Sequence, residues 1–78
     1  MPVYYFHIHG RDGTIPDDEG SELADEDAAR DEALTAVREM VADTIKRGGN
    51  PADGRELWIV DESGTVLFAI PFDQIWGT

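Results

Sequence analysis

The stretch ELWIVDESGTVLFAI at residues 56–70 decides the fold of this 78-residue chain. Two apolar runs flank a polar turn with a glycine at residues 61–64, which predicts an antiparallel hairpin. A hairpin with one face in water alternates apolar and polar residues, yet residues 57–60 and 66–70 are apolar at every position. Both faces of this part of the sheet are therefore expected to need cover.

Upstream of the hairpin, the sequence predicts a strand, a tight turn and a short return strand. Residues 3–9 are rich in β-branched and aromatic side chains, as strands are, and the Asp12-Gly13 pair is typical of a tight turn. The return strand is expected at residues 14–15. Because Pro16 has no amide hydrogen to donate, this strand is expected at an edge of the sheet.

A helix is predicted to begin after Asp25, whose carboxylate can accept backbone N–H bonds from the first turn. Gly48-Gly49 can end it in a left-handed conformation. Apolar residues recur between these ends at steps of three and four, namely Ala33, Leu34, Val37, Met40, Val41, Thr44 and Ile45. The prediction is a single α+β domain, residues 1–78, of order β-β-α-β-β, with an antiparallel sheet of three or four strands packed by one helix.

Composition restricts the partners that the chain can have. Six basic against 17 acidic residues give a net charge of −11, which argues against direct binding to nucleic acids or anionic membranes. The hydrophobic fraction of 41% is well above that of a disordered acidic tail. Without cysteine, signal peptide or membrane-spanning run, the protein is expected in the cytoplasm, and no residue pattern points to a cofactor.

Two groups of polar residues are weak candidates for cation binding. His7 and His9 lie two apart on a predicted strand, so both imidazoles share one face, but no third ligand has a fixed spacing. Ordinary polar-face histidines are the preferred interpretation. Residues 17–27 are acidic without the spacing of an EF-hand, so a solvated loop is predicted and adventitious cation binding is the alternative. No nucleophile motif or phosphate loop is found, so no catalytic residue and no enzyme is predicted.

The C-terminal third holds a candidate interface. One helix covers only one face of the sheet, so the other must meet the C-terminal residues, a second subunit or a partner protein. Aromatic side chains dominate buried interfaces, and an intrachain core is the competing interpretation of the same residues. The predicted contact residues are Trp58, Phe68, Phe72, Ile75 and Trp76.

The chain resembles a family of small, uncharacterised, mostly alphaproteobacterial proteins classed as a domain of unknown function. The resemblance rests on MPVYYFH at residues 1–7, the Asp12-Gly13 turn, DDEGSEL at residues 17–23 and DESGTVL at residues 61–67. It implies no known activity. In the placement of Asp25 and of Glu32-Ala33-Leu34, the chain is more distantly similar to HicB-type antitoxins.

These patterns predict a non-enzymatic interaction or regulatory module that forms a homodimer through the uncovered sheet face. The alternative is an acidic inhibitor, antitoxin-like or a nucleic-acid mimic, that binds a basic groove on another protein. The acids that would then matter are Asp27, Asp31, Glu32, Glu39 and Asp43. A metal-dependent enzyme that uses His7 and His9 is the third hypothesis.

Overall fold

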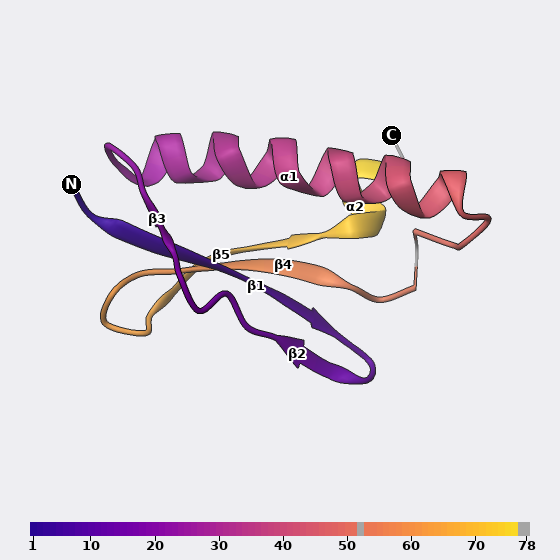
Figure 1. Ribbon diagram of the computed structural model, residues 1–78, viewed down its shortest axis with the longest axis horizontal. Helices are drawn as coiled ribbons and strands as arrows, with labels where there is room; N and C mark the ends of the chain where they lie inside the picture. The colour runs from indigo at the N-terminus through magenta and orange to yellow at the C-terminus, as the bar shows by residue number, and fades with distance from the viewer. Residues whose placement is uncertain (52, 77–78) are drawn as a thin grey trace.

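The structure is a computed structural model that describes residues 1–51 and 53–76, the side chain of residue 76 excepted. An antiparallel sheet lies beneath a long helix, α1 (Glu26–Lys46). A short second helix, α2 (Phe72–Trp76), lies on the same side of the sheet as α1 (Figure 1). The described parts of the molecule therefore form two layers, helices above and sheet below.

The predicted α+β class, with an antiparallel sheet packed by one main helix, is confirmed. The sheet has five strands rather than three or four, and the order is β-β-β-α-β-β followed by α2. Neighbours run in the order β2-β1-β4-β5, and β3 pairs with β1 beside β2. The strands are β1 (Val3–Gly10), β2 (Gly13–Ile15), β3 (Ser21–Glu22), β4 (Glu56–Val60) and β5 (Val66–Pro71).

The core lies between α1 and one face of the sheet. In the β1–β4 pair, Phe6 is opposite Ile59 and Ile8 is opposite Leu57, and residues opposite each other share a face. Leu57 and Ile59 are completely buried there. From α1, the buried residues are Ala29, Ala33, Val37 and Val41.

Helix α1 begins and ends where the sequence predicts. The Asp25 carboxylate accepts a hydrogen bond from the N–H of Ala28 at 2.8 Å, and Gly48 has a φ of +79° just after the C-terminus. Ile45, predicted as part of the apolar stripe, is 43% exposed. No helix in the described part of the chain is long and apolar enough to cross a membrane.

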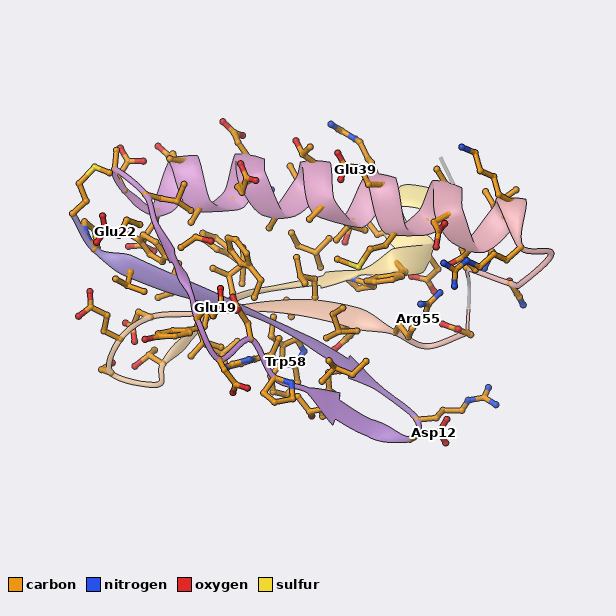
Figure 2. The ribbon with its side chains drawn as sticks, viewed as in Figure 1. Asp12, Glu19, Glu22, Glu39, Arg55 and Trp58 are labelled. Atoms are coloured by element: carbon orange, nitrogen blue, oxygen red, sulfur yellow. The ribbon has the colours of Figure 1, made fainter. Side chains whose placement is uncertain are left out.

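The C-terminal residues pack beneath α1 instead of crossing the other face of the sheet. Phe72 is completely buried, and the Arg55 guanidinium lies 4.7 Å from the centre of its ring. Arg55 also donates hydrogen bonds of 2.9 Å to Asp53 Oδ1 and Thr44 Oγ1. Figure 2 shows Arg55 between β4 and the last turns of α1. This residue therefore joins β4, α1 and α2.

Candidate interaction surface

The face of the sheet turned away from α1, called the outer face below, is built from alternate residues of β1, β4 and β5. Tyr5 is opposite Val60, His7 is opposite Trp58, and Trp58 is in turn opposite Ala69. None of the described helices or strands forms a second layer on this face (Figure 1). The register assigns to it Tyr5, His7, His9, Glu56, Trp58, Val60, Val66 and Ala69.

Four rings on the outer face stack in pairs. The ring centres of His9 and Trp58 are 4.3 Å apart with planes inclined at 17°, and those of Tyr5 and His7 are 6.3 Å apart at 16°. The indole N–H of Trp58 donates to the Glu56 carboxylate at 2.9 Å. Figure 2 shows Trp58 pointing away from α1. The outer face is thus aromatic, and the one carboxylate among its residues is hydrogen-bonded to an aromatic neighbour.

Asp17 organises the loop that borders this face. Its carboxylate accepts hydrogen bonds from the N–H groups of Phe6 at 3.1 Å, Glu19 at 3.3 Å and Gly20 at 3.2 Å, and its own N–H donates to His7 Nδ1 at 2.9 Å. Phe6 lies between the parts of β1 that pair with β2 and with β3. The carboxylate therefore takes the place of a strand at the point where β1 has no strand partner on that side.

Hydrogen bonds lower the pKa of two carboxyl groups at this end of the face. Burial raises the pKa of Asp17, but the three N–H donors and the charge of His7 outweigh burial, and the pKa is lowered. The Ser63 hydroxyl and the Thr65 N–H lower the pKa of Asp61 in the turn between β4 and β5. Both groups are therefore ionised at neutral pH.

A hollow of about 350 Å³ lies at the end of the outer face where β1 begins. Tyr5, His7 and Val60 contribute its aromatic and apolar part. Its acidic part consists of Asp17, Asp18, Asp61 and Glu62. The ion pairs found among residues 1–51 and 53–76 join Arg47 to Asp43 and Arg55 to Asp53, so neither neutralises the hollow.

The two histidines share the outer face, as predicted, but each is held by other partners. Nδ1 of His7 accepts the Asp17 N–H, and Nδ1 of His9 lies 2.6 Å from Thr14 Oγ1. A neutral His7 that accepts at Nδ1 carries its proton on Nε2, which leaves no lone pair for a metal ion. Among the residues that the structure describes, no group of three His, Cys, Asp or Glu side chains is placed to hold one.

The predicted contact residues do not form one surface. Trp58 lies on the outer face, whereas Phe72 is completely buried and Phe68 and Ile75 are partly buried against the core beneath α1. The side chain of Trp76 lies outside the described residues.

A register shift accounts for the position of Phe68. A bulge between Ile59 and Val60 places Phe68 opposite the core residue Ile59, so its ring faces α1, where Arg30 lies 5.7 Å from the ring centre. Tyr5, His7 and His9 were not predicted as partners of Trp58. Their period-two alternation in residues 3–9 was the available signal, but which strand lies beside them depends on tertiary structure.

Fold and surface together define the class of this protein: a small α+β domain with one open, aromatic sheet face and an acidic helix. Residues 3–73 match the family described as a domain of unknown function (DUF6894), and the chain belongs to that family. The resemblance to an uncharacterised family is thereby confirmed. No match was found among curated proteins or among solved structures.

Proposed function

We propose that this protein is a non-enzymatic interaction module that forms a homodimer through its outer face. The observation that carries the proposal is the row of stacked rings on a sheet face that no described helix or strand covers. Tryptophan and tyrosine are enriched at the centres of protein interfaces because they bury a large area with few rotatable bonds. A regulatory role in the cytoplasm is part of the same proposal.

The distribution of charge supports the outer face as the contact surface. Only one of the 17 acidic residues, Glu56, belongs to the outer face, and it is hydrogen-bonded to Trp58. Figure 2 shows Glu39 on the side of α1 that faces away from the sheet, opposite to Trp58. Two outer faces can therefore meet without bringing the acidic sides of the two helices together.

Light scattering across a protein concentration series tests this proposal. We expect a concentration-dependent rise from monomer to dimer mass, and we expect Trp58→Ser to weaken it at least about tenfold, as loss of an aromatic interface residue does. Ile45→Ser, which removes an exposed apolar side chain from α1, is the matched control and should dimerise like the wild type. Monomer mass up to about 1 mM, a weak affinity by any standard, or an unchanged dimer in Trp58→Ser would refute the proposal.

A second function is favoured by one further observation, the exposed acidic side of α1. The acids that the sequence assigns to an inhibitor are all exposed there: Asp27, Asp31, Glu32, Glu39 and Asp43. An antitoxin-like inhibitor or nucleic-acid mimic would use this surface to occupy a basic groove. Its binding should fall steeply with added salt and should be lost in the variant Asp31→Lys with Glu39→Lys, whereas Trp58→Ser should leave it intact.

A further inference from the structure

The outer face is charged oppositely at its two ends. At one end, the acidic hollow combines Asp17, Asp18, Asp61 and Glu62. At the other end, the turn between β1 and β2 carries Arg11, which is exposed and takes part in neither of the ion pairs found in the described part of the chain. Figure 1 shows this hairpin bending away from α1, toward the side of the outer face.

The hollow is rigid as well as negative. Glu62 Oε1 accepts the N–H of Val3 at 2.8 Å, and Asp17 and Asp61 each accept several backbone N–H bonds. Carboxylates fixed in this way lose little side-chain entropy when a guanidinium joins them. The end of the outer face is therefore prepared for a cationic side chain.

Two outer faces can stack with their strands parallel or antiparallel, and charge distinguishes the two arrangements. Parallel stacking places hollow against hollow and Arg11 against Arg11, so like charges meet at both ends. Antiparallel stacking places the β1–β2 turn of each copy over the hollow of the other. Arg11 and Tyr5 each lie three residues from Ile8, so a two-fold axis near Ile8 brings Arg11 over Tyr5, a residue of the hollow.

We propose that two copies of this chain stack with antiparallel strands about that axis, and that Arg11 of each copy enters the acidic hollow of the other. The inference rests on the proposed homodimer and specifies its geometry. The contact is isologous, because the same two patches meet twice across the axis, and such an arrangement closes as a dimer without forming filaments.

The size of the outer face supports the contribution of both ends. Four strands spaced about 4.8 Å apart, with about five residues of about 3.3 Å each, cover only about 300 Å² in plan. A stable interface buries about 800 Å² on each partner. The sheet alone falls short of this area, and the reciprocal insertion of the β1–β2 turns adds contacts where the flat face ends.

A charge exchange between two variants tests the geometry. Arg11→Glu places an acid against the hollow, and Asp18→Lys with Glu62→Lys places bases against Arg11. Each variant alone should dimerise at least about tenfold more weakly than the wild type, since facing like charges cost several kcal/mol. An equimolar mixture should form a heterodimer with near wild-type affinity, because both contacts then join opposite charges. Light scattering and sedimentation measure the three samples.

Two additional variants make the experiment robust. Glu62 accepts the Val3 N–H, so Asp18→Lys alone is also mixed with Arg11→Glu in case the double variant is unstable. Asp12 lies beside Arg11 in the exposed turn, as Figure 2 shows, and would be repelled by the hollow. Asp12→Asn is therefore expected to strengthen the dimer about two- to tenfold.

The outcomes separate the geometry from the proposed function. If Arg11→Glu and the lysine variants dimerise like the wild type, the geometry is refuted while the homodimer stands. If the single variants are weakened but their mixture does not associate, the two ends do not meet, and the geometry is again refuted. A wild type that stays monomeric refutes both. Salt alone does not replace the exchange, because it weakens the Arg11 contact and also relieves repulsion between two copies of net charge −11.

Discussion

The Asp17 carboxylate substitutes for strand backbone beside Phe6, so its loss leaves several N–H groups without an acceptor. In Asp17→Asn, the amide keeps one neutral oxygen and adds donors where donors already converge. We expect the free energy of unfolding to fall by about 1–3 kcal/mol at neutral pH, measured by urea unfolding. Asp18→Asn, at the exposed neighbouring position, should change it by less than about 0.5 kcal/mol.

The lowered pKa of Asp17 gives this prediction a pH signature. Because the folded pKa lies below the unfolded value of 3.8, the ionised carboxylate stabilises the fold above about pH 4, and this contribution is lost as the pH falls through the folded pKa. The difference in stability between wild type and Asp17→Asn should therefore shrink in acid. A difference that stays constant from about pH 7 to about pH 3 would contradict the role assigned to the carboxylate.

Gly20 is required both by its backbone conformation and by the space around it. Its φ is +72°, and a Cβ atom there would lie 2.6 Å from Val3 Cγ1 and 2.9 Å from Tyr5 Cε1. Gly48 has a similar φ of +79° with no atom within 4 Å of such a Cβ, so it is the matched control. We expect Gly48→Ala to cost about 1 kcal/mol and Gly20→Ala to cost about 1–3 kcal/mol more, measured by chemical denaturation. Equal losses would show that the loop yields to the methyl group.

Among the elements, the junction of β4, α1 and α2 depends on one side chain. Arg55 bonds to Thr44 and Asp53 and covers the ring of Phe72, so Arg55→Ala removes hydrogen bonds and a cation–π contact together. We expect a loss of about 1–3 kcal/mol in thermal unfolding, with increased hydrogen exchange in α2.

The control for this junction is Arg47→Ala. Its ion pair with Asp43 joins two exposed side chains one turn apart, and such pairs contribute less than about 1 kcal/mol. If the two alanine variants were equally stable, Arg55 would be an ordinary surface residue and α2 would be held by Phe72 alone.

The elements that the sequence predicted are those with strong local signals. The cap at Asp25, the glycines after α1 and the apolar runs on both sides of residues 61–64 each specify structure within a few residues. β3 has two residues and α2 has five, so neither is long enough to show a period. Both exist because of tertiary contacts, β3 with the start of β1 and α2 with α1.

The candidate surface was predicted less well than the fold, for a related reason. Trp58 and Phe68 are both aromatic strand residues, and only the bulge in the β4–β5 pair sends them to opposite faces. Asp17 carries no distinctive pattern within an acidic segment, since its role depends on a gap between two strand partners of β1. A single sequence shows which residues are apolar or charged but not which register they adopt.

At the scale of the whole molecule, the net charge of −11 opposes folding, because the compact state crowds like charges together. Raising the ionic strength from about 0.01 M to about 0.15 M shortens the screening length from about 30 Å to about 8 Å. We therefore expect the unfolding temperature of dilute protein to rise over this range, measured by circular dichroism. Asp31→Lys with Glu39→Lys should reduce the rise, and an unfolding temperature that falls with salt would show that attractive charge pairs dominate.

The pairing of β1 with β4 also determines when the protein can fold in the cell. β1 is among the first parts of the chain to be made, yet the strand that covers its inner edge begins at Glu56 and is itself supported by β5, which ends at Pro71. At about 5–20 residues per second, the ribosome needs about 3–12 seconds to proceed from one to the other. During that interval, the aromatic residues of β1 have only the β1–β2 hairpin and α1 for company. Folding of this domain therefore follows the synthesis of β5, and until then its most aggregation-prone strand depends on the strongly acidic segment that follows it to stay in solution.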